Sequence, residues 1–181
     1  MSIVENLYKN VKTTETRDDY QTPEEIIYPI LDFIYKNKII WECTGTKNSN
    51  ITKILKSNGF NVIETHIDEG FNFLTNKPNF NFDIIITNSP FSLKTEFITR
   101  CYEIGKPFML LLPVTALEGT ARQKLYAQYG IKLLLFNRRV NFIRKELKTG
   151  CWFGSAWFCW NIDKIKQQLN FLNIIKTKIK N

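Results

Sequence analysis

Apolar residues along the chain gather in short continuous runs that are separated by helix-length segments. The clearest run, 83–87 (DIIIT), is rich in β-branched residues and suits a parallel strand buried on both faces. Comparable runs lie at 38–43, 61–65, 107–112, 131–136 and 154–160. Strands that alternate with helix-length segments are typical of βαβ units. The pattern therefore predicts an α/β fold with a mostly parallel, twisted sheet and helices on both faces.

Several intervening segments carry helix signals. Ahead of the first strand, Thr22 suits an N-cap, Pro23 the first helical position, and Glu25 completes a capping box. The helix that follows, to about residue 34, contains Pro29 and should bend there. Ser92 is the expected N-cap of a helix that ends near residue 104. Further helices are expected at 51–58, 121–129 and 163–173.

The length and hydropathy of the chain favour one packed domain. The chain has 181 residues, of which 44% are hydrophobic, enough for one sizeable core. We expect a flexible arm at 1–19, the domain itself at 20–173 and a basic tail at 174–181. No apolar run approaches the ~18 residues of a membrane span, and the first residues lack the apolar centre of a signal peptide. These features predict a cytoplasmic protein with no membrane partner.

The charge and the metal-ligating residues narrow the class of function. The net charge of +8 suits a polyanionic partner, although a composition crowded with Lys, Asn and Ile also produces such an excess. The four cysteines show no metal-binding spacing, and free thiols in a reducing compartment explain them. The single histidine argues against a His-rich metal site or a Ser/His/Asp hydrolase. No metal is expected.

The central strand ends at a polar tetrapeptide, Asn88-Ser89-Pro90-Phe91. Ligands of open α/β sheets bind at the carboxyl ends of the strands, where this tetrapeptide lies. An amino group on a planar ring is a poor nucleophile because its lone pair is delocalised. The Asn88 side-chain oxygen and the Ser89 backbone oxygen could hold its two hydrogens and free the lone pair. Pro90 would stiffen the turn and Phe91 would stack on a base. An Asx turn that closes the strand is the simpler alternative.

The tetrapeptide resembles the NPPF/DPPY signature of adenine-N6 methyltransferases, which use S-adenosylmethionine (SAM). The order of segments over 20–160 resembles phage-type members of that family, including an R-x-x-F element before a W-x-C-W strand. The resemblance implies a single-domain, Rossmann-like class I SAM-dependent methyltransferase fold. It also implies methyl transfer to the N6 amino group of adenine in nucleic acid, with Asn88, Ser89, Pro90 and Phe91 as catalytic residues.

The same resemblance implies where SAM would bind. Family members show an acidic residue, a small residue and G-x-G after the first strand, and here Glu42 and Gly45 match, while Lys47 or Asn48 takes the second glycine position. An acidic residue usually follows the second strand, and Glu64, His66 and Asp68 compete for that role. The alignment we favour places His66 on it, with Asp68 one pleat further on. The expected cofactor-binding residues are Tyr20, Thr22, Pro23, Glu42, Thr44, Gly45, His66, Asp68 and Asn72.

A basic segment after the last helix of the βαβ pattern would meet the nucleic acid. Its phosphate-binding candidates are Arg138, Arg139, Arg144, Lys145 and Lys148. DNA is favoured over RNA as the polymer. A chain of this length has no room for a separate recognition domain, so loops, the tail, a homodimer or a partner subunit would supply specificity.

Two other functions remain open. A degenerate methyltransferase fold could bind nucleic acid or a partner subunit without catalysis, since several positions depart from the family pattern. The enzyme could also methylate a glutamine side-chain amide, another planar nitrogen, although the basic segment favours nucleic acid.

Overall fold

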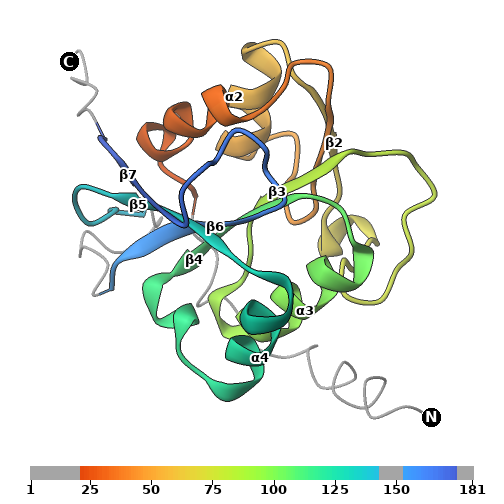
Figure 1. Cartoon of the computed structure of the whole chain (residues 1–181). Helices are drawn as coiled ribbons and strands as arrows, with labels where there is room; N and C mark the ends of the chain where they lie inside the picture. The colour runs from red at the N-terminus through yellow and green to blue at the C-terminus, as the bar shows by residue number, and fades with distance from the viewer. Residues whose placement is uncertain (1–20, 143–152, 175–181) are drawn as a thin grey trace, which may run out of the picture.

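The computed structural model of the protein describes residues 21–142 and 153–174. Within these residues seven strands form one sheet in the order β2-β1-β3-β4-β6-β5-β7 (Figure 1). The strands are β1 (Ile39–Glu42), β2 (Asn61–Glu64), β3 (Ile84–Asn88), β4 (Phe108–Pro113), β5 (Lys132–Phe136), β6 (Ser155–Trp160) and β7 (Leu169–Leu172). All the apolar runs expected to form strands do so, within one or two residues of the expected bounds.

The sheet is mostly parallel, as predicted. β1 pairs in parallel with β2 and β3, β3 with β4, and β5 with β7. β6 is inserted between β4 and β5 and runs antiparallel to both. The chain leaves β1 for β2 on one side and returns to β3 on the other. This reversal of strand order opens a crevice at the carboxyl ends of β1 and β3, which is the place where such sheets bind ligands.

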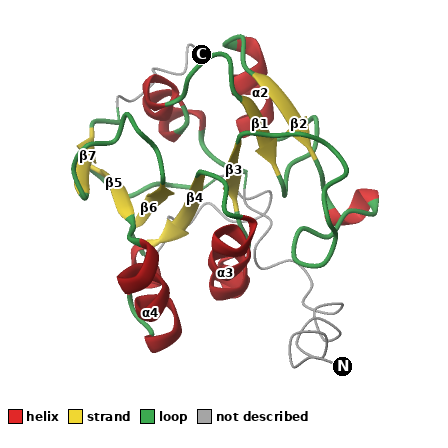
Figure 2. Cartoon of the chain, turned by 45° about the vertical axis from the view of Figure 1, so that its right-hand side comes forward, coloured by secondary structure: helices red, strands yellow, loops and turns green. Residues whose placement is uncertain are grey.

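Helices cover both faces of the sheet (Figure 2). They are α2 (Asn50–Ser57), α3 (Lys94–Ile104) and α4 (Thr120–Tyr129), with 3-10 segments at Glu24–Ile26, Tyr28–Phe33, Ile67–Glu69, Phe91–Leu93 and Val114–Leu117. Because side chains alternate along a strand, Ile84 and Ile86 join the core beneath α2 and the N-terminal 3-10 segments, whereas Ile85 joins the core beneath α3. Buried apolar side chains on both faces explain why the runs are continuous rather than alternating.

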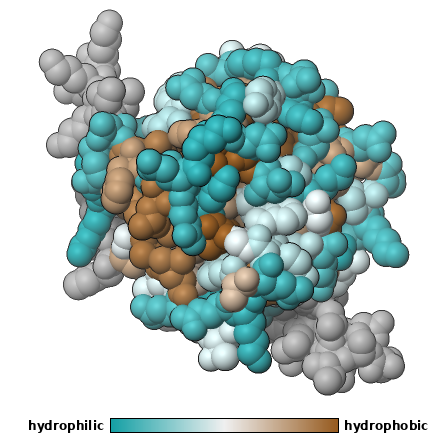
Figure 3. Space-filling view, in the orientation of Figure 1, coloured by the Kyte–Doolittle hydropathy of each residue, from teal (hydrophilic) through white to brown (hydrophobic). Residues whose placement is uncertain are grey.

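The surface in the view of Figure 1 is mostly hydrophilic, but apolar side chains gather on the side where β4, β5 and β6 lie (Figure 3). The most exposed large apolar side chain of the described residues is Phe171 on the edge strand β7, which is 76% exposed. None of the described helices is both long and apolar enough to cross a bilayer.

The N-terminal helix prediction is wrong in type. Residues expected to form one bent helix form two 3-10 segments, Glu24–Ile26 and Tyr28–Phe33. Pro29 lacks an N–H and its ring opposes an α-helical turn before it, so α-helical bonding does not run through the segment. Pro23 occupies the N-cap without a side-chain hydrogen bond, and Thr22 is buried instead of capping.

Two further helix predictions need correction. Ser92 is not the N-cap of α3, because a 3-10 turn at Phe91–Leu93 precedes the helix and places Leu93 at that position. The segment 163–173 is not helical, because its end forms β7, whose backbone pairs with the otherwise open edge of β5. The predicted arm at 1–19, most of the tail (175–181) and the basic loop at 143–150 lie outside the described residues.

Candidate active site

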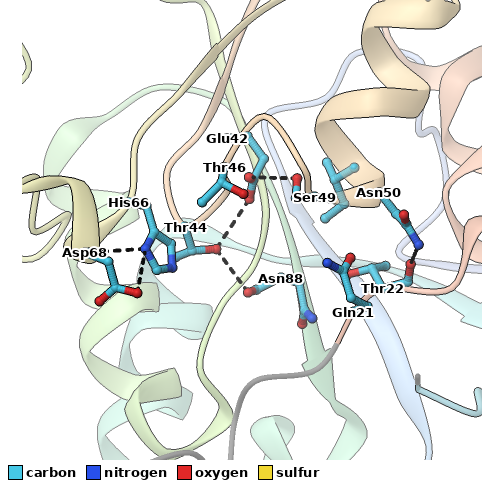
Figure 4. Close-up of a pocket in the computed structure, with 11 residues that line it drawn as sticks. Gln21, Thr22, Glu42, Thr44, Thr46, Ser49, Asn50, His66, Asp68 and Asn88 are labelled. Carbon is cyan, nitrogen blue, oxygen red and sulfur yellow. Dashed lines mark hydrogen bonds and ion pairs between the residues drawn. The ribbon is translucent and has the colours of Figure 1, made fainter. Parts of the chain in front are cut away.

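A polar cavity of about 260 Å³ opens at the carboxyl ends of β1 and β3 (Figure 4). The cavity is lined by Gln21, Thr22, Glu42, Thr44, Thr46, Ser49, Asn50, Ile51, His66, Asp68 and Asn88. Six of the residues predicted from the sequence therefore meet here, namely Thr22, Glu42, Thr44, His66, Asp68 and Asn88. They come from four separate segments, and the switch in strand order brings them together.

Glu42, at the end of β1, is the central acid of the cavity and is only 2% exposed. Thr87 donates a hydrogen bond to its Oε1 at 2.7 Å, and Thr44 and Ser49 contribute longer hydroxyl contacts at 3.3 and 3.4 Å. Burial raises the pKa of Glu42 to about 7, since the carboxylate loses hydration that these hydroxyl groups restore only in part. A cation in the cavity would therefore be stabilised by a carboxylate that has little other charge compensation.

Gly45 allows the loop after β1 to close over Glu42. A Cβ atom at residue 45 would lie 0.9 Å from Glu42 Oε2, so no larger residue fits without displacement of that carboxyl. Lys47 and Asn48, at the second glycine position of the expected motif, are both exposed. The loop then ends at Ser49, whose Oγ accepts a hydrogen bond from Thr52 N and caps α2. The glycine that the geometry requires is thus the one that the sequence retains.

A second, smaller cavity of about 90 Å³ adjoins the first and is mostly apolar. It is lined by Cys43, Thr44, His66, Ile67, Phe71, Asn72, Phe73, Leu74, Pro90, Leu93 and Phe97. Thr44 and His66 line both cavities. Asn72 Oδ1 accepts a hydrogen bond from Leu74 N at 3.0 Å, which fixes the amide at the cavity wall. Together the two cavities form a polar compartment next to an apolar compartment that is lined by aromatic side chains.

His66 is a capping residue as well as a lining residue. Its Nδ1 accepts a hydrogen bond from Asp68 N at 3.2 Å and lies 3.4 Å from Asp68 Oδ2. The Asp68 side chain is 85% exposed and lies at the rim of the cavity. Glu64, His66 and Asp68 were the candidates for the acidic position after β2. Of these, Glu64 is paired with Lys56, with 2.8 Å between Oε2 and Nζ, and does not line either cavity.

The tetrapeptide that follows β3 lies beside both cavities. The backbone oxygen of Asn88 accepts a hydrogen bond from Thr44 at 3.1 Å, while its side chain lines the polar cavity. Ser89 is buried and Pro90 lines the apolar cavity. The ring of Phe91 packs edge-on against Phe142 and Phe153, with centroid distances of 5.7 and 5.5 Å. The turn is therefore held by contacts at its first and last residues.

The predicted phosphate contacts are only partly described. Arg138 forms an ion pair with Glu25, with 2.7 Å between Nη2 and Oε2, and Arg139 is exposed. Arg144, Lys145 and Lys148, and the predicted cofactor residue Tyr20, lie outside the described residues. Pro23 is buried and does not line either cavity. Within 21–142 and 153–174, no three metal-ligating side chains cluster.

The sequence matches no protein-family model and no curated protein. The fold is similar to a candidate class I SAM-dependent methyltransferase from Listeria monocytogenes, with a TM-score of 0.55 and 14% identity over 93% of this chain and 70% of that one. The chain has a class I methyltransferase fold. Weaker likenesses are a modification subunit of a candidate type I restriction enzyme from Vibrio vulnificus (TM-score 0.47, 8% identity, 97% of this chain and 51% of that one) and a candidate methyltransferase from Thermoplasma acidophilum (0.36, 12%, 85% and 69%).

Sequence reasoning missed several polar residues of this site. They are Gln21, Thr46, Ser49, Asn50 and Thr87. Three of them belong to the hydroxyl- and amide-rich loop 44–50, which follows β1 and so must lie at the carboxyl edge of the sheet. The position of this loop directly after the first predicted strand was the signal that could have identified these residues. Thr87 was hidden inside the apolar run of β3, and only the pairing of β3 beside β1 shows that it faces Glu42.

Proposed function

We propose that the chain is a SAM-dependent methyltransferase that modifies the N6 amino group of adenine in nucleic acid, with DNA as the favoured polymer. One observation carries the proposal: a polar and an apolar cavity adjoin each other, and the Asn-Ser-Pro-Phe turn lies at the edge of both. The two cavities fit the cofactor, and the turn fits a planar amino group.

The residues of the two cavities fit the chemical groups of SAM. The buried carboxyl of Glu42 would offset the positive charge of the methionine end, and the hydroxyls of Thr44 and Ser49 would hold its polar atoms. Asp68, or His66, would meet the ribose hydroxyls from the rim. The aromatic walls of the smaller cavity would enclose the adenine ring, with Asn72 at its edge. When bound, the cofactor supplies an electrophilic methyl group.

The protein's own part in the reaction is to orient the nucleophile. Thr44 occupies the backbone oxygen of Asn88, so the acceptors proposed for the substrate are the Asn88 side-chain oxygen and the Ser89 backbone oxygen. Two acceptors on the two amino hydrogens would turn the nitrogen lone pair out of conjugation and toward the methyl group. The proton can leave after transfer, when the nitrogen is positively charged, so a general base with a shifted pKa is not required.

The target base would leave its stack to reach this turn. Phe142 and Phe153 hold Phe91 edge-on, which restricts the ring against which the base would stack. Ser155 lies at the same edge of the sheet as Asn88, with β4 between them, because Pro113 pairs with Ser155 and Leu111 pairs with Asn88. Its hydroxyl is buried and has no hydrogen-bond partner among the described residues. The edge of the target base would supply this hydroxyl with a hydrogen-bond partner.

Transfer of labelled methyl groups from SAM to DNA and to RNA, with digestion to nucleosides, tests the proposal. N6-methyladenine should form in the wild type, and Asn88→Ala should lower turnover at saturating SAM roughly a hundredfold or more. Asn79→Ala, in an exposed loop, is the matched control and should be fully active.

The outcomes separate the candidate functions. SAM binding without a methylated base on either polymer would favour the non-catalytic alternative. Full activity of Asn88→Ala with a lower melting temperature would identify Asn88 as a turn residue only.

A further inference from the structure

The first described residues, 21–26, form one wall of the polar cavity. Gln21 and Thr22 line the cavity directly (Figure 4), although they are distant in sequence from the strands that carry the rest of the site. We call residues 21–26 the N-terminal wall. The wall contributes no strand to the seven-stranded sheet, so its position depends on contacts with other parts of the chain.

Three hydrogen bonds from three separate parts of the chain fix the N-terminal wall. Asn50, at the start of α2, donates to the Thr22 backbone oxygen at 2.9 Å, and Trp157, on β6, donates to the Ile26 backbone oxygen at 3.0 Å. Between them, Arg138 Nη2 donates to Glu25 Oε2 at 2.7 Å across 113 residues of sequence. Only this third contact joins two charged groups, and both are largely shielded, with side chains 29% and 19% exposed. Shielded, charge-assisted bonds of this length are the strong ones.

We propose that Arg138 is a positioning residue for the cofactor: through Glu25 it holds Thr22 and Gln21 against the polar cavity. This inference rests on the proposed function, and it reassigns Arg138 from the phosphate contacts predicted by sequence. The guanidinium group that would meet a phosphate already binds a carboxylate of its own chain. Its exposed neighbour Arg139 keeps the phosphate role.

The fold itself does not depend on this ion pair. Ile26, Ile27 and Ile30 are completely buried beneath the sheet and hold the segment by apolar contact. The bonds from Asn50 and Trp157 also remain when Arg138 is changed. Loss of the pair should therefore loosen the wall where it faces the cavity and leave the core packed. Loss of the pair should therefore lower cofactor affinity and leave folding and the chemical step unchanged.

Calorimetric titration with SAM, together with the salt dependence of DNA binding, tests the inference. Glu25→Gln, which is isosteric, and Arg138→Gln should each raise the SAM dissociation constant by a similar factor of about ten. The charge exchange Glu25→Arg with Arg138→Glu should recover much of the affinity. Arg138→Lys should recover part, and turnover of Glu25→Gln at saturating SAM should match the wild type. Arg139→Gln, the matched control, should leave SAM affinity unchanged and lower the salt slope by about one.

Two results would overturn the inference. Unchanged SAM affinity in both Glu25→Gln and Arg138→Gln would show that the ion pair does not position the cavity wall. A salt slope lowered by about one in Arg138→Gln would show that Arg138 binds phosphate after all. Failure of the wild type to bind SAM is a separate result, which would reject the proposed function and this inference with it.

Discussion

Gly45→Ala is expected to disable the polar cavity through a direct collision. The added Cβ would lie 0.9 Å from Glu42 Oε2 and 2.1 Å from its Cδ, distances at which atoms cannot coexist. The carboxyl must leave the place where it meets Thr87, Thr44 and Ser49. Loss of these contacts to a buried acid should lower the free energy of unfolding by about 2–4 kcal/mol. SAM affinity should fall as well, because the displaced Glu42 side chain would either block the cavity or no longer face it.

Urea unfolding and calorimetric titration with SAM measure the two effects. Gly154→Ala is the matched control, since a Cβ there would make only an ordinary contact, 3.6 Å from Val114. The double variant Gly45→Ala with Glu42→Ala removes the colliding side chain, so the two changes should be strongly non-additive. If Gly45→Ala costs no more than Gly154→Ala, or if the cycle is additive, then the loop does not close over Glu42 as described.

Further predictions concern pH, the buried hydroxyl and the basic segment. Because the folded-state pKa of Glu42, about 7, exceeds the ordinary 4.5, the folded protein holds the proton more tightly. Its stability should therefore fall by about 3 kcal/mol as pH rises from 4.5 through 7, and Glu42→Gln should remove this slope in pH-dependent urea unfolding. Ser155→Ala should keep or slightly raise the melting temperature, yet raise the Michaelis constant for nucleic acid; an unchanged constant would exclude base contact. Neutralising Arg144, Lys145 and Lys148 together should lower the salt slope of DNA binding by about 2–3, and an unchanged slope would remove them from the interface.

The strands were predictable because their burial follows from a local feature of the sequence, a run of consecutive apolar residues. Ile84, Ile85 and Ile86 are buried on alternate faces, and a sheet covered on both sides requires consecutive apolar residues of this kind. The helix types were less predictable. Pro29 excluded an α-helix that the apolar stripe of 26–34 favoured, and the stripe still became buried in 3-10 form. Residues 169–172 became β7 because β5 offered an open edge, which no local pattern reveals.

The candidate site was predictable where a residue follows a strand directly. Glu42 and Asn88 end β1 and β3, so the rule that ligands bind at the carboxyl ends of strands placed both correctly. The ion pair of Arg138 could not be predicted in this way, because its partner, Glu25, lies 113 residues away. A cluster of positive charges in sequence says which residues could meet phosphate, but it does not show which of them are already neutralised by a distant acid of the same chain.

The antiparallel strand β6 gives the fold a late step of assembly. Leu110 of β4 pairs with Phe158 of β6. Almost fifty more residues must therefore be synthesised after Leu110 before this edge of β4 is covered. Until then Leu110, Leu111 and Leu112, all completely buried in the final protein, border an open strand edge. Pairings this distant in sequence form slowly, and open apolar edges recruit other chains. A nascent or truncated chain that stops before β6 would retain the residues of β1 and β3 that form the site, yet it would be prone to aggregation.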